Sequence, residues 1–146
     1  MDKKLIVVLG GLILCVGTFL PLANASSTSV SFMMPGDGDA PVVGIMLAAC
    51  GALGVLLALI GHARHAVWFG LVALALVVWK FLQLKNLMDQ ASAMTAGVEL
   101  PPEVAAQMPT MNMLGWGVLG LGALIMVIGG AMAWKGGTSA PPPAAV

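Results

Sequence analysis

The sequence predicts an all-α membrane protein, a bundle of four transmembrane helices with both termini on the cytoplasmic side. First, 60% of the 146 residues are hydrophobic and only 8% are charged, whereas a soluble domain carries about 25% charged residues. Second, four apolar runs approach the roughly 20 residues that a helix needs to cross a bilayer core. Third, the lysines and arginines are distributed unequally between the segments that join these runs. The length is that of a single domain.

The four predicted helices span residues 5–22, 42–60, 66–84 and 113–134. They form one transmembrane bundle over residues 1–135, with outer loops at 24–41 and 86–112. None of the runs has a charge near its centre, and a chain inside lipid must be helical to satisfy its own backbone groups.

The orientation follows from the basic residues. Lys3 and Lys4 precede the first helix, Arg64 lies between the second and third, and Lys135 follows the fourth. On the other side the charged residues are mostly acidic, with Lys85 as the one clear basic residue: Asp37, Asp39, Asp89, Glu99 and Glu103. Because cytoplasmic loops are enriched in Lys and Arg, we expect a multi-pass protein of the bacterial cytoplasmic (inner) membrane.

Residues near the predicted helix ends fit the two membrane interfaces. Trp68, Trp79, Trp116 and Trp134 all lie close to such ends, as in the aromatic belts of membrane proteins. Lys80 lies about one turn inside the outer end of the third helix. We expect its long side chain to carry the ammonium group out to the headgroups.

Residues 1–25 allow a second interpretation, because they also resemble a secretory signal peptide. Lys3 and Lys4 are followed by an apolar stretch and by Pro21, and 23–25 have the small-x-small pattern Ala-Asn-Ala. The apolar stretch is nearly long enough to span a bilayer, which favours retention. Cleavage would leave three helices without changing the orientation of the rest.

Glycine recurs at a spacing of seven in three of the four runs. That spacing keeps residues on one face of a helix in a left-handed pair, and small residues let membrane helices approach closely. The candidate helix-packing residues are therefore Gly10, Gly17, Gly44, Gly51, Gly115, Gly122 and Gly129. The pattern does not distinguish packing within one chain from packing between chains.

Local structure is also expected outside the bundle. Residues 33–41 are rich in turn-forming types, and residues 26–32 are compatible with a short extended segment or strand. Pro101-Pro102-Glu103 is a suitable start for a short helix, and the third helix is able to continue past the membrane to Met94. The tail, residues 136–146, contains Pro141-Pro142-Pro143 and is expected to be flexible or extended.

The sequence predicts no enzyme, no cofactor and no metal site. Cys15 and Cys50 lie within apolar runs and are interpreted as small hydrophobic residues. His62 and His65 have no carboxylate or cysteine beside them, and such a pair is a poor metal site.

Seven methionines lie in or beside the outer loops, and their thioethers suit Cu(I): Met33, Met34, Met88, Met94, Met108, Met111 and Met113. Balanced charge and the lack of tyrosine argue against a nucleic-acid partner.

The stretch Gly17-Thr18-Phe19-Leu20-Pro21 ends the first apolar run, and a glycine-rich run closes the bundle. In this layout the chain resembles a group of small bacterial four-helix membrane proteins, a resemblance that implies architecture rather than chemistry. The leading hypothesis is a non-catalytic accessory or structural subunit of a larger membrane complex. It would contact the lipid bilayer and other subunits or copies of itself. The alternatives are a homo-oligomeric channel or small transporter, and a methionine-rich copper-handling protein.

Overall fold

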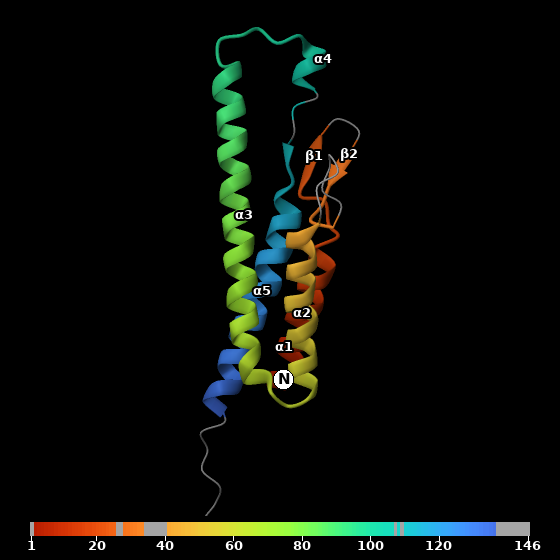
Figure 1. Ribbon diagram of the computed structural model, residues 1–146, viewed down its shortest axis with the longest axis vertical. Helices are drawn as coiled ribbons and strands as arrows, with labels where there is room; N and C mark the ends of the chain where they lie inside the picture. Colours follow the sequence, from red (N-terminus) through yellow and green to blue (C-terminus); the bar gives the residue numbers. More distant parts are fainter. Residues whose placement is uncertain (1, 26–27, 34–40, 107, 109, 137–146) are drawn as a thin grey trace, which may run out of the picture.

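The computed structural model describes residues 2–25, 28–33, 41–106, 108 and 110–136. Its long helices are α1 (Lys3–Gly17), α2 (Val42–Leu59), α3 (Ala66–Thr95) and α5 (Met113–Gly136). A 3-10 turn, η2 (Ala63–His65), joins α2 to α3, and α4 (Pro102–Ala105) is a single turn. Three short strands, β1 (Ala23–Ala25), β2 (Thr28–Val30) and β3 (Thr110–Met111), lie at one end of the bundle (Figure 1). We call this the sheet end and the opposite end, which contains η2, the basic end.

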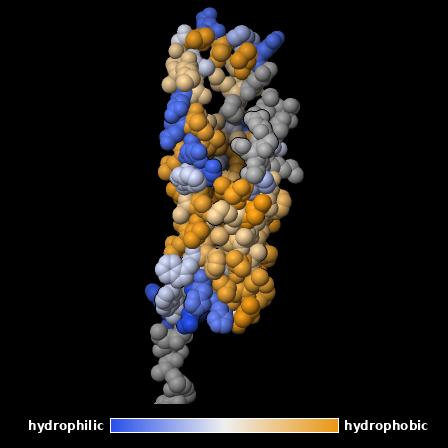
Figure 2. All heavy atoms as spheres, in the orientation of Figure 1, coloured by the Kyte–Doolittle hydropathy of each residue, from blue (hydrophilic) through white to orange (hydrophobic). Residues whose placement is uncertain are grey.

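The four long helices pack as a ring in the order α1, α2, α3, α5, and the contact between α1 and α5 is the most extensive. Three apolar segments, Val42–Leu59, Ala63–Thr95 and Met113–Gly136, are helical and long enough to cross a membrane. This agrees with the apolar runs predicted at 42–60, 66–84 and 113–134. Hydrophobic residues dominate the middle of the face shown in Figure 2, and hydrophilic ones gather near its lower end and on the upper part of α3.

The first helix is shorter than the predicted 5–22. It has 15 residues and ends at Gly17. After Gly17 the backbone changes from α-helical hydrogen bonds to tighter turns that bond three residues back. The Thr18 hydroxyl donates a hydrogen bond to the carbonyl of Cys15 at 2.7 Å, and the amides of Phe19 and Leu20 each bond to the carbonyl three residues back. These tighter turns lead into Pro21, which has no amide proton to continue a helix.

The third helix is longer than the apolar run that predicts it. It continues through the expected extension to Met94 and ends at Thr95. Its 30 residues correspond to about 45 Å at 1.5 Å per residue, compared with a bilayer core of about 30 Å. In Figure 1, α3 therefore rises well beyond the adjacent part of the helical bundle at the sheet end.

An antiparallel sheet in the order β2-β1-β3 closes the sheet end. β1 pairs with β2 through Ala23↔Val30 and with β3 through Ala23↔Met111. The strand β2 lies inside the segment 26–32 that the sequence marks as extended, and α4 begins at Pro102, as expected. The outer loops predicted at 24–41 and 86–112 thus contain part of the sheet, α4 and the end of α3. The turn-rich part at 34–40 and the tail beyond Gly136 lie outside the described residues.

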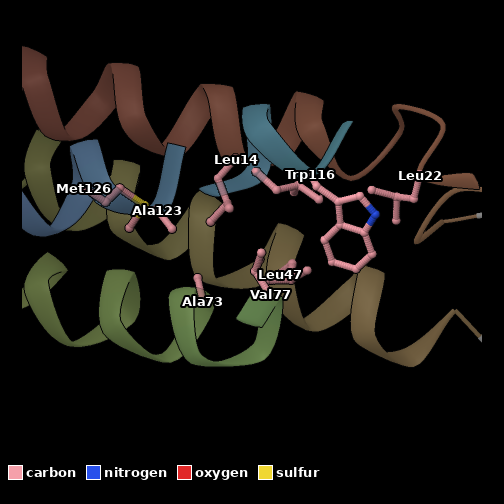
Figure 3. Close-up of a cluster of buried hydrophobic side chains, with 9 residues drawn as sticks. Leu14, Leu22, Leu47, Ala73, Val77, Trp116, Ala123 and Met126 are labelled. Carbon is pink, nitrogen blue, oxygen red and sulfur yellow. The ribbon is translucent and has the colours of Figure 1, made fainter. Parts of the chain in front are cut away.

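The core is built from aliphatic side chains contributed by all four long helices (Figure 3). Leu14, Leu47, Leu119 and Met126 are fully buried. Trp116 belongs to this core, with only 7% of its surface exposed, so its predicted place in an interfacial belt is wrong. Its ring lies edge-to-face with Phe32 and Phe81, at centroid distances of 5.5 and 5.3 Å. The other three tryptophans are more than half exposed.

We expect Trp116→Ala to lower the free energy of unfolding by about 3–5 kcal/mol, because it leaves a large cavity between two aromatic rings. Thermal unfolding in detergent measures the effect. Trp68→Ala is the matched control, since Trp68 is 58% exposed and should change stability by less than about 1 kcal/mol. Equal losses for the two variants would contradict the buried position of Trp116.

Candidate functional site

The candidate site is the set of helix-packing glycines, and four of the seven lie between α1 and α5. A methyl group built on Gly10 would lie 2.7 Å from the amide nitrogen of Met126, and one on Gly122 would lie 2.7 Å from the amide nitrogen of Leu14. One on Gly129 would lie 3.0 Å from the amide nitrogen of Val7. Since real Cβ atoms do not approach backbone so closely, the two helices lie backbone to backbone. We call this contact the α1/α5 seam. Gly17 also belongs to this seam, because a methyl group built on it would lie 2.9 Å from the Cδ2 atom of Leu119.

Gly51 forms a second close contact, between α1 and α2. A methyl group on it would lie 2.8 Å from the carbonyl oxygen of Gly11 and 2.8 Å from the sulfur of Cys15. The thiol of Cys15 in turn lies 3.5 Å from the carbonyl oxygen of Ala48, which accepts its hydrogen bond. Both cysteines are free and half-buried, so Cys15 contributes here as a small packing residue.

The two remaining predicted glycines contact irregular backbone at the sheet end rather than another helix. Gly115 faces Pro21, where a methyl group would lie 2.5 Å from the carbonyl oxygen, and Gly44 faces the carbonyl of Phe32. These positions hold the segments flanking the sheet against the first turns of α5 and α2. Their heptad spacing places them on the faces of the other glycines, but their contacts differ in kind.

Sequence reasoning missed the glycines that join α3 to α5. Methyl groups on Gly70 and Gly130 would lie 3.1 Å from the amide nitrogen of Val127 and 2.8 Å from that of Val67, respectively. Gly11, opposite Gly51, was missed as well. A search for small residues three or four apart would have found the α3 position, because Ala66, Gly70 and Ala73 share one buried face.

Among the described residues, the polar groups inside the bundle include the half-buried thiols of Cys15 and Cys50 and the indole nitrogen of Trp116, which is buried without a hydrogen-bond partner. In the part of the chain that the structure describes, Thr18 and Ser31 are the buried polar residues, and no group of three His, Cys, Asp or Glu is placed to hold a metal. The His62 and His65 rings stack at 6.1 Å, and the Arg64 Nε donates to His65 Nε2 at 3.2 Å. Lys80 donates to the Gln83 amide oxygen at 3.0 Å.

The described methionines near the sheet end lie on different elements. Met33 follows β2, Met88 and Met94 belong to α3, Met108 precedes β3, Met111 ends β3 and Met113 begins α5. Met34 lies outside the described residues.

Comparisons with protein-family models, with curated proteins and with solved structures find no match for this chain. Any functional proposal therefore depends on the geometry and chemistry of the chain itself.

We expect Gly122→Val to destabilise the bundle by about 1–3 kcal/mol, because the new side chain would overlap the backbone of α1. Gly120→Val is the matched control on the same helix, since nothing lies within 4 Å of a Cβ built at Gly120. Both variants carry the same change in helix propensity, so the difference in their unfolding midpoints in detergent isolates the steric term. A Gly120 variant as unstable as the Gly122 variant would argue against the seam.

Proposed function

We propose that the chain is a non-catalytic accessory or structural subunit of a larger membrane protein complex in a bacterial inner membrane. In this proposal α1 is the fourth transmembrane helix, residues 1–25 are retained, and both termini are cytoplasmic. The main support for the subunit proposal is the exposure of apolar side chains at the end of α3, which extends beyond the expected thickness of the bilayer core.

The packing of α1 supports its role as a fourth span. Residues 3–20, including the tighter turns after Gly17, give a path of about 27 Å at the helical rise, close to the bilayer core. Large apolar side chains point outward along it, with Leu5, Leu12 and Phe19 each more than half exposed. The α1/α5 seam places α1 alongside α5, a helix of 24 residues, so both helices would occupy the same layer of lipid.

The distribution of charge supports the orientation. Lys3, Lys4 and Arg64 gather around one cavity at the basic end. Asp89 lies in the last two turns of α3, and Glu99 and Glu103 lie between α3 and α5, near the sheet end. Short loops rich in Lys and Arg favour the cytoplasmic side.

The end of α3 and the segment after it offer a surface for a partner. Leu87 is 56% exposed, Met94 81% and Val98 61%. In the middle of a transmembrane helix such side chains would face lipid. Here Leu87 and Met94 lie in the last turns of α3 and Val98 follows the helix, beyond the expected thickness of the bilayer core, where exposed apolar surface commonly marks an interaction site. Methionine suits such a surface, because its flexible thioether adapts to different shapes.

A pore through a single chain has little support. The described residues along the inside of the ring are mostly apolar, including Trp116, and the Thr18 hydroxyl is already bonded to the helix backbone. A transport path normally needs polar or ionisable side chains at membrane depth. The channel hypothesis would therefore require several copies around a shared axis.

Purification in mild detergent followed by native mass spectrometry tests the proposal. We expect the chain to appear with at least one different membrane protein at a fixed ratio. The double variant Leu87→Ala, Met94→Ala should lose most of that partner, since it removes apolar surface from the end of α3. A closed ring of identical copies would instead contradict the accessory role and favour the channel.

The control for this experiment is Leu53→Ala, Met132→Ala, which removes the same two side-chain types from exposed positions on α2 and α5, away from the end of α3. Both positions are exposed, at 44% and 46%. Equal loss of the partner in the control would show that the end of α3 is not the specific contact.

Retention of residues 1–25 has a separate test. Cleavage after Ala25 would remove α1 and with it one side of the α1/α5 seam, and it would also remove β1, the central strand of the sheet. We therefore expect denaturing mass spectrometry of the membrane-extracted protein to give the intact 14.8 kDa. A mature form that begins at Ser26 would overturn the four-helix proposal.

A further inference from the structure

The basic end contains an open cavity of about 410 Å³, lined by Lys3, Lys4, His62, Arg64, Ala133 and Gly136. Three separate parts of the chain meet there: the first turn of α1, the turn between α2 and α3, and the last turn of α5. We propose that this cavity binds the phosphate group of an anionic phospholipid headgroup.

The charge of the lining favours an anion. Two lysines and an arginine face the cavity, and no acidic residue is among the described residues that line it. The helix ends add no clear preference, because the partial positive charge at the N-terminus of α1 is opposed by the partial negative charge at the C-terminus of α5, so the side-chain cations provide the attraction. Lysine and arginine are both phosphate ligands, the first as a point charge and the second as a planar fork.

The fold brings these cations together at fixed positions. The Lys3 ammonium fills the space that a methyl group built on Gly136, at the end of α5, would need, and the Lys4 ammonium lies 3.9 Å from a methyl group built at Gly61. Gly61 has a φ of +93°, a conformation that glycine adopts most easily. It reverses the chain after α2, so that His62 and Arg64 face the same space. The α1/α5 seam in turn fixes Lys3 relative to Gly136.

The level of the cavity points to lipid rather than to a soluble anion. Leu59, the last residue of α2, and Ile60, which follows it, are 67% and 69% exposed, and they directly precede the lining residues. Trp68 and Trp134, also exposed, lie near the same end, where aromatic side chains mark the membrane interface. A lipid phosphate at the boundary could enter the cavity while its acyl chains follow the apolar surface. Basic pockets at helix ends hold anionic headgroups in this way.

The test is native mass spectrometry of the full chain titrated with phosphatidylglycerol or with phosphatidylcholine. We expect the first phosphatidylglycerol to bind at least tenfold more tightly than phosphatidylcholine. In Lys4→Gln, Arg64→Gln the affinity for phosphatidylglycerol should fall by roughly 10- to 30-fold and the preference should be lost, because each basic residue near an anionic surface changes affinity about fivefold. Lys4→Arg, Arg64→Lys keeps both charges and should restore the preference, which separates charge from misfolding.

Lys80→Gln, Lys85→Gln is the matched control, removing two charges from α3 well away from the cavity. It should leave the preference unchanged; an equal loss would show only a general effect of net charge and would overturn the proposal. In a final measurement, soluble glycerol phosphate is added as a competitor for the bound lipid. If it displaced the lipid at micromolar concentration, the cavity would be a site for a free phosphate ester and the lipid assignment would fail.

Discussion

The rest of the structure depends on the close contact between the backbones of α1 and α5. Glycines on both helices face each other across it, and Gly10 and Gly122 each leave room only for the opposite main chain. In lipid, helices gain nothing from hiding apolar surface, so their association depends on such close packing. The ring closes around this pair, because α2 packs on α1 and α3 packs on α5.

The seam does not stop where the helices end. The chain leaves α1, turns at Pro21 and continues as β1, while β3 leads directly into α5. These two strands pair with each other, and the amide of Asn112 bonds to the carbonyl of Leu22 at 2.8 Å. The first and last parts of the described chain thus run antiparallel from the basic end to the sheet end, with Gly115 against Pro21 where helix changes to strand.

Much of this fold could be predicted from the sequence, and the failures have clear physical reasons. Helices α2, α3 and α5 follow from run length and hydropathy, which are local properties. The early end of α1 depends on a Thr18 side-chain bond, and the pairing of β1 with β3 joins residues far apart in the chain. The direction of the Trp116 ring depends on Phe32 and Phe81. Neither the strand pairing nor the direction of the Trp116 ring can be predicted from neighbouring residues in the sequence, because both depend on residues far away in the chain. Heptad spacing picked out the glycines of the seam, but the Gly70 and Gly130 contacts require knowing which helices are adjacent.

The seam also has a consequence for the order of synthesis. Gly10 and Met126 are separated by more than a hundred residues, so α1 leaves the ribosome long before its partner exists. At roughly 5–20 residues per second, the wait is on the order of ten seconds. During that time α2 can cover one side of α1, but the glycine face that packs against α5 stays uncovered until the last helix has been made. Assembly of this small bundle is therefore completed from its last helix.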